Sequence, residues 1–135
     1  CTVAEIVAPS DVERERWGHV YTIEIVEALV RRARQNVDRT GFTERVTVVS
    51  GDGGQGLPSE APFDRVYVTA AAPEVPKPLV DQLKPEGVLL VPVGEPHFFQ
   101  TLVKVVKLRD GKTLRSDHGG VSFVPLVGRE GFGGL

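Results

Sequence analysis

The sequence predicts an α/β protein built on a doubly wound, mostly parallel sheet. Two observations favour this class. Short β-branched and apolar runs alternate with segments whose apolar residues recur at helical spacing. In the last third of the chain, alternating runs are joined by a tight turn, which predicts antiparallel strands at one edge of the sheet. Of the 135 residues 41% are apolar, enough for a buried core, and the length fits one domain or a piece of one.

The first half of the chain predicts a helix end, a loop, a strand, a helix and a second strand. "CTVAEIVA" (1–8) is typical of the last turns of a helix, and the polar run over 9–19 of a loop. "VYTIEI" (20–25) and "RVTVVS" (45–50) predict buried strands. Gly41 predicts the end of the helix between them. The apolar face of that helix consists of Val26, Leu29, Val30, Ala33 and Val37.

The second half predicts a third strand, a short helix and further strands. A proline near its start and Gly87 after its end favour the helix. The predicted elements are the strand "FDRVYVTAAAP" (63–73), the helix "PKPLVDQLKPEG" (76–87), the strand "VLLVPVG" (88–94), two strands in 101–117 joined by "RDGK", and the strand "VSFVPLVG" (121–128).

Composition excludes several classes of function. The net charge of −2 gives no electrostatic basis for binding nucleic acid or an anionic membrane. No apolar run approaches the ~18–20 residues that span a bilayer, and no signal peptide is visible. The single cysteine, Cys1, cannot form an internal disulfide, so we expect a cytoplasmic protein. The three histidines lie far apart, with no paired acids at ligand spacing, so we expect no metal. No hydrolytic triad is present either.

Polar or small residues end three of the predicted parallel strands, where ligands of doubly wound sheets bind. Glu24 ends the first; its two oxygens suit the hydroxyls of a ribose, or it interacts with the dipole of the following helix. Asp52 follows the second and suits an adenine amine, or it forms an Asx-turn in its own loop. Ile25 offers an apolar face to a purine, and Thr69–Ala72 end the third strand.

The glycine-rich stretch "VVSGDGGQGLP" (48–58) invites a phosphate-binding interpretation. It lacks the Lys-Ser/Thr ending of a P-loop, and the carboxylate of Asp52 would repel a phosphate. We therefore interpret the glycines as backbone freedom for a turn that passes close to a flat ring.

Three segments in order resemble the protein-L-isoaspartate O-methyltransferase family: "VYTIEIVEALVRRARQNV", "GDGGQGLPSEAPFDRV" through "TAAAPEVPKPLVDQLKPEG", and "GGVSFVPLVG". The resemblance implies a Rossmann-like class I fold that uses S-adenosylmethionine. It implies methylation of the α-carboxylate of L-isoaspartyl residues in damaged proteins, after which the ester collapses to a succinimide that can reopen as aspartate. It also implies a protein that acts as a monomer when full length.

The same resemblance assigns residues to the site. It places Glu24 at the ribose, Ile25 beside the adenine, and Gly51 with Asp52 as the adenine-contacting pair. It places Thr69 and Ala70 at the cofactor and Ala71 and Ala72 at the substrate. The C-terminal segment Val121, Ser122, Phe123 and Val124 would line the substrate cleft and pair with a peptide through its backbone.

The sequence departs from the family pattern at its start. It contains no methionine and begins within a helix, so we expect residues 1–135 to be the C-terminal part of a single methyltransferase domain. The first strand, its glycine-rich motif and the active-site serine would then lie before Cys1, leaving an incomplete sheet and a chain inactive by itself. The segment "APSDVERERWGH" (8–19) is longer than the family's turn and is interpreted as a surface insertion.

Two alternatives remain open on the sequence. One is a nucleoside-binding module of the same fold without catalysis, and the other is a methyltransferase of a small molecule. A strand with a glycine-rich turn upstream would favour an enzyme over a binding module. A screen of acceptors would separate the two enzymes.

Overall fold

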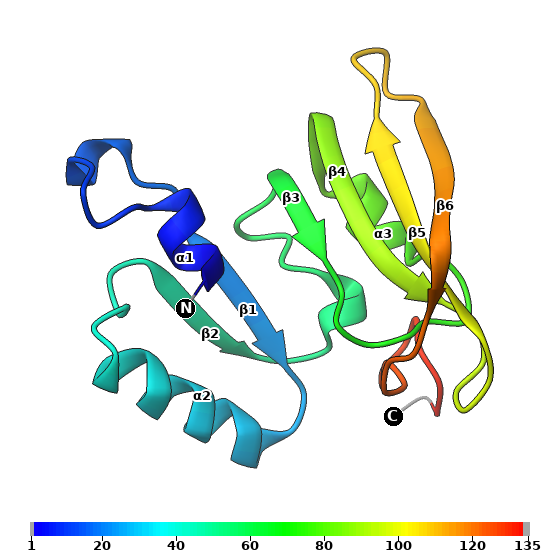
Figure 1. The fold of residues 1–135 in the computed structure, drawn as a ribbon, viewed down its shortest axis with the longest axis horizontal. Coiled ribbons are helices and arrows are strands. Elements are labelled where there is room, and N and C mark those ends of the chain that lie inside the picture. The colour runs from blue at the N-terminus through cyan, green and yellow to red at the C-terminus, as the bar shows by residue number, and fades with distance from the viewer. Residues whose placement is uncertain (1, 134–135) are drawn as a thin grey trace. The chain divides into compact units, whose positions relative to one another are not determined.

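The computed structural model describes residues 2–133, which fall into two compact units, Cys1–Gly51 and Asp52–Leu135 (Figure 1). Helices and strands alternate through both units up to β4, as the sequence predicts. The elements are α1 (Thr2–Val7), β1 (Val20–Glu24), α2 (Glu27–Arg39), β2 (Val46–Ser50), β3 (Phe63–Tyr67), α3 (Lys77–Asp81), β4 (Leu83–Val93), β5 (Gln100–Lys107) and β6 (Thr113–Val121), with short 3-10 turns at Arg14–Arg16 and Gly53–Gln55.

The first unit is a pair of parallel strands with a helix beside it. β1 and β2 pair in register from Val20 opposite Val46 to Glu24 opposite Ser50. The connecting helix α2 lies along this pair (Figure 1) and buries Val30 completely. The predicted apolar face is only partly covered, because Val26 and Leu29 remain 48% and 47% exposed. Gly41 ends the helix as predicted, with a φ of 75° and an N–H that donates to Asp38.

The loop over 9–19 packs over a buried arginine. Arg45 is 8% exposed, and its guanidinium lies 5.1 Å from the ring of Trp17 and 4.2 Å from that of Phe42. It donates to Glu5 and to the carbonyl of Ala8, both at 2.8 Å. The indole of Trp17 donates into the loop's own backbone. The predicted surface insertion is therefore anchored to the unit by its one tryptophan.

The Glu5 carboxylate gives this unit an acid-sensitive contact. Hydrogen bonds from the hydroxyl and N–H of Ser10, and then the charge of Arg45, lower the pKa of Glu5 from 4.5 to about 2. A depressed pKa stabilises the fold above pH 4.5, and that contribution is lost as the pH falls toward about 2. We expect the difference in unfolding free energy between wild type and Glu5→Gln to shrink over this range, measured by denaturant unfolding. A difference that is constant from pH 5 to pH 2 would contradict the assignment.

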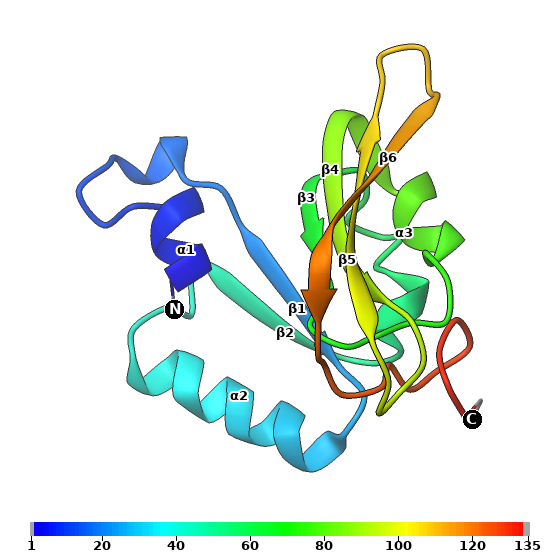
Figure 2. The same ribbon diagram turned by 45° about the vertical axis from the view of Figure 1, so that its right-hand side comes forward.

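The second unit is a four-stranded sheet in the order β3-β4-β5-β6 (Figures 1 and 2). The β3–β4 ladder is parallel, and the β4–β5 and β5–β6 ladders are antiparallel. This confirms the predicted antiparallel edge and the predicted hairpin, whose turn contains Gly111 at a φ of 84°. The helix α3 covers one face of the sheet (Figure 2).

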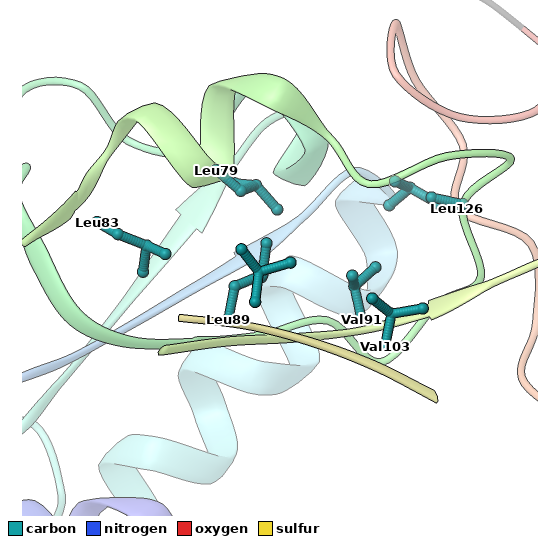
Figure 3. Packing of buried hydrophobic residues seen from close by; sticks show 8 residues of the cluster. Leu79, Leu83, Leu89, Val91, Val103 and Leu126 are labelled. Carbon is teal, nitrogen blue, oxygen red and sulfur yellow. The ribbon is translucent and has the colours of Figure 1, made fainter. Parts of the chain in front are cut away.

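The core of this unit lies between α3 and the sheet. Leu79 of α3 packs against Leu89 and Val91 of β4 and Val103 of β5, each less than 5% exposed (Figure 3). Leu126 of the C-terminal segment closes one end of the same cluster. Lys107 ties the helix to the sheet, since its ammonium donates to three carbonyls at the end of α3 and the start of β4.

Three predicted elements are wrong in extent. The strand expected over 63–73 ends at Tyr67. The helix expected over 76–87 ends at Asp81, because Pro85 cannot continue a helix. The chain instead enters β4, and an irregularity absorbs the residues between Leu83, opposite Phe63, and Val88, opposite Arg65. The strand expected over 121–128 contributes only Val121 to β6; beyond it two isolated bridges join Pro125 to Ala71 and Val127 to Phe132.

Each sheet has a parallel strand at one edge. Within residues 2–133, β1 has β2 as its neighbour in the sheet, and β3 has β4. The expected first strand of the family's sheet is not among these elements, and its position remains a prediction.

Candidate functional site

Glu24 ends β1 immediately before α2. One carboxylate oxygen accepts a hydrogen bond at 2.8 Å from the N–H of Val26, the residue that precedes the first turn of α2. The other oxygen has no hydrogen-bond partner in the described part of the chain, and the residue is half-buried. The carbonyl of Glu24 accepts from the N–H of Gly51 at 3.0 Å, which joins the ends of β1 and β2. One oxygen of Glu24 is thus used at the start of α2, and both the ribose and the dipole interpretations stay predictions.

Asp52 uses both of its carboxylate oxygens to hold backbone. One accepts from the N–H of Gly54 at 2.9 Å, which is the Asx-turn anticipated as an alternative. The other accepts from the N–H of Arg129 at 2.7 Å, 77 residues further along the chain. A Cβ on Gly128, whose φ is 141°, would lie 2.2 Å from an Asp52 oxygen, so only glycine fits there. We call Asp52, Gly128 and Arg129 the Asp52 clamp.

Gln82, at the end of α3, holds the other half of the glycine-rich stretch. Its side-chain oxygen accepts from the N–H of Leu57 at 2.8 Å, and its nitrogen donates to the carbonyl of Gln55 at 2.9 Å. A Cβ on Gly56 would lie 2.2 Å from the Gln82 amide oxygen. The loop therefore needs Gly56 for close contact with a side-chain amide of this chain; passage close to a flat ring stays a prediction.

The small residues after β3 are built into the second unit. Ala71 and Ala72 are fully buried. The N–H and carbonyl of Ala71 bond to Val124 and Leu126, both at 2.8 Å, and those of Ala72 bond to Pro92 and Gly94. The backbone of Ala71 thus fixes the C-terminal segment, and that of Ala72 bonds to the end of β4. Thr69 is exposed and Ala70 half-buried, so these two carry the accessible surface of the stretch.

The C-terminal segment lies at the end of β6. Val121 is half-buried, while Ser122, Phe123 and Val124 are exposed. Gln100, which is 1% exposed, accepts from the N–H of Phe123 at 2.7 Å and donates to its carbonyl at 2.9 Å. The same segment reaches Ala71 through Val124 and Leu126, and Asp52 through Arg129.

The structure thus brings Asp52, Ala71, Ala72 and the C-terminal segment together within the second unit, while Glu24 and Ile25 belong to the first. An open depression of about 380 Å³ also lies in the second unit, lined by 73–77 and 129–131. The sequence-based prediction of the site misses four residues that hold its backbone: Gln82, Gln100, Gly128 and Arg129. The one available signal was a glutamine at the start of a strand rich in valine, at Gln100.

The described part of the chain lacks other features. Among residues 2–133, no group of three or more histidine, cysteine or acidic side chains could hold a metal ion. None of the helices there combines the length and apolar character required to cross a membrane.

Comparison with known proteins was made on sequence and on structure. The protein-L-isoaspartate O-methyltransferase of Hyperthermus butylicus is 53% identical over 130 residues, which are 96% of this chain and 54% of that protein. That of Thermococcus onnurineus is 51% identical over 113 residues, 84% of this chain and 51% of that protein. The chain spans about half the length of the curated relatives it matches.

A solved structure shows the same fold. A protein-L-isoaspartate O-methyltransferase of Plasmodium falciparum, in complex with S-adenosyl-L-homocysteine, superposes with a TM-score of 0.72 at 25% identity, covering 87% of this chain and 56% of that one. This confirms the predicted class I methyltransferase fold. Residues 6–131 match the model of the family described as Protein-L-isoaspartate(D-aspartate) O-methyltransferase. The chain belongs to the protein-L-isoaspartate(D-aspartate) O-methyltransferase family.

Proposed function

We propose that this chain is the C-terminal, ligand-binding part of an enzyme that methylates the α-carboxylate of L-isoaspartyl residues in damaged proteins, with S-adenosylmethionine as methyl donor. The observation that carries the proposal is the family match over residues 6–131. It is supported by relatives of that name at 53% and 51% identity and by the bound S-adenosyl-L-homocysteine in the Plasmodium falciparum protein.

The hydrogen-bond acceptors and apolar side chains assigned to the site fit the nucleoside part of that cofactor. The uncommitted oxygen of Glu24, a charged acceptor, suits ribose hydroxyls, and Ile25 is half-buried beside it. A carboxylate oxygen has two lone pairs, so Asp52, with Gly51 before it, can accept from an adenine amine while it holds its backbone partners. We assign Thr69 and Ala70, the accessible end of the stretch after β3, to the same ligand. When bound, S-adenosylmethionine supplies a methyl group on a sulfonium, which leaves as a neutral thioether.

The chemistry requires little acid–base help from the chain. A substrate carboxyl with an ordinary pKa of ~4 is ionised at neutral pH, so its oxygen attacks without a general base. The task left to the residues is to hold the carboxylate in line with the methyl group. We therefore name no catalytic residue among 1–135. The predicted active-site serine falls outside this sequence.

The substrate side of the site is assigned to two segments. Ala71 and Ala72 form its buried floor, and Val121–Val124 form an edge that pairs with the main chain of the substrate. We further propose that the protein is a monomer in the cytoplasm, which suits a chain with a single cysteine.

The test is a methyl-transfer assay on the full-length gene product. We expect transfer from labelled S-adenosylmethionine to a peptide containing L-isoaspartate, and none to the same peptide containing aspartate. Transfer to small acids but not to the peptide would favour a small-molecule methyltransferase. Calorimetric binding of S-adenosyl-L-homocysteine without transfer to any acceptor would favour a nucleoside-binding module.

A further inference from the structure

Gln100 is the most deeply buried polar side chain of the second unit, and its amide is used in an unusual way. It begins β5 and is 1% exposed. Burial of a side-chain amide costs free energy unless both its donor and its acceptor are paired. Both are paired here, and with one residue only: Phe123, through its N–H at 2.7 Å and its carbonyl at 2.9 Å. The side chain of Gln100 therefore takes the place of a strand backbone.

The place where this occurs explains why a side chain is needed. The β5–β6 ladder ends at the pair Gln100–Val121. Before Gln100 the chain leaves the sheet through an exposed loop, so β5 has no backbone to offer to residues beyond Val121. The amide of Gln100 extends the ladder by one step and holds Phe123 in an extended conformation, since only then do its N–H and carbonyl point the same way.

The direction of Phe123 fixes the direction of its neighbours. A trans peptide unit points its carbonyl and its N–H to opposite sides. Because the N–H of Phe123 points toward Gln100, the carbonyl of Ser122 points away from it. Because the carbonyl of Phe123 points toward Gln100, the N–H of Val124 also points away. Neither of these two outward groups has a hydrogen-bond partner within residues 2–133, and both residues are exposed.

We propose that Gln100 is a positioning residue for the substrate: it presents the carbonyl of Ser122 and the N–H of Val124 as one acceptor and one donor to the main chain of an extended isoaspartyl polypeptide. This inference rests on the proposed function. The next carbonyl on the outward side, that of Val124, is already bonded to Ala71 at 2.8 Å, which stops the edge there. The pairing surface is therefore short, and it recognises backbone irrespective of the substrate's sequence.

The first test needs no mutation. In the full-length gene product we expect one amide-to-ester replacement, at the substrate N–H that donates to Ser122, to raise the KM of an isoaspartyl peptide about two- to tenfold. Esters elsewhere in the peptide should leave KM unchanged. If no single ester raises KM, the inference is overturned.

The second test changes the positioning residue. Gln100→Met keeps the volume but leaves Phe123 unpaired; we expect a KM about five- to tenfold higher, with kcat and the Kd of S-adenosyl-L-homocysteine unchanged. In this variant, the ester that raises the KM of the wild type should raise the KM no further. Gln100→Glu retains the acceptor for the Phe123 N–H. Its KM should therefore lie between those of the wild type and Gln100→Met.

The outcomes separate this inference from the function on which it rests. A wild-type protein that methylates no isoaspartyl peptide overturns the proposed function, and the inference with it. A wild type that methylates the peptide with the KM of Gln100→Met overturns the inference alone. A parallel loss of kcat, cofactor affinity and thermal stability in both variants would assign Gln100 to folding and overturn its positioning role.

Discussion

Asp52→Ala is expected to lower the free energy of unfolding of the full-length gene product by about 2–4 kcal/mol. The substitution removes two charge-assisted hydrogen bonds and leaves the N–H groups of Gly54 and Arg129 without their acceptor. The bond to Arg129 joins segments 77 residues apart, so its loss frees the backbone at Arg129 as well as the local turn. Denaturant unfolding followed by circular dichroism measures the difference.

Gly128→Ala provides a matched control, since it disturbs the Asp52 clamp while the carboxylate stays in place. The added Cβ would lie 2.2 Å from the Asp52 oxygen at a φ of 141°, so the clamp must open. We expect a loss of stability similar to that of Asp52→Ala. Gly111→Ala, at a hairpin glycine with nothing within 4 Å of an added Cβ, reports the cost of positive φ alone. A Gly128→Ala loss no larger than that of Gly111→Ala would contradict the clamp.

Comparison of Asp52→Ala with Gly128→Ala separates the two roles assigned to Asp52, contact with the adenine and support of the backbone. If Asp52 contacts the adenine as well as the backbone, Asp52→Ala should weaken binding of S-adenosyl-L-homocysteine more than Gly128→Ala does. Equal affinities in the two variants would leave the carboxylate with its structural role only.

The sequence predicts the strands of this fold well because their signal is local. β-branched runs such as "VYTIE" and "VTVVS" bury at least part of their length wherever they are packed, and "RDGK" specifies its turn by itself. The prediction of a helix over 76–87 is wrong for a local reason too. Apolar spacing favours its continuation, while Pro85 forbids it, and Gln82 leaves the helix to hold the loop at 55–57.

The contacts that shape the site could not be predicted in this way. Gln82, Gln100 and Asp52 each hold backbone that is 23 to 77 residues distant. Nothing in the neighbouring sequence distinguishes such a glutamine from a solvent-exposed one. Glycine at 56 and at 128 signals a special conformation, but the side chain that requires it becomes visible only in the fold. The family resemblance supplied the ligand for Glu24 and Asp52, and the structure supplied their backbone partners.

Glu24→Ala is expected to weaken the binding of S-adenosyl-L-homocysteine to the full-length gene product by about 1–3 kcal/mol, or about 5- to 150-fold in Kd. The uncommitted oxygen of Glu24 is a charged acceptor at a strand end, and a ribose hydroxyl that loses it has no other acceptor of its kind on β1. Isothermal titration calorimetry gives the Kd directly, without dependence on turnover.

Glu24→Gln separates this binding role from the hydrogen bond of Glu24 to the start of α2. The amide oxygen of glutamine can still accept from the N–H of Val26, so the helix start and the unfolding free energy should be nearly unchanged. The charge, however, is lost, and hydrogen bonds to charged groups are about twice as strong as neutral ones. We therefore expect an affinity between those of wild type and Glu24→Ala. If both variants bind with the wild-type Kd while Glu24→Ala alone loses stability, Glu24 only holds the start of α2 and the ribose assignment is wrong.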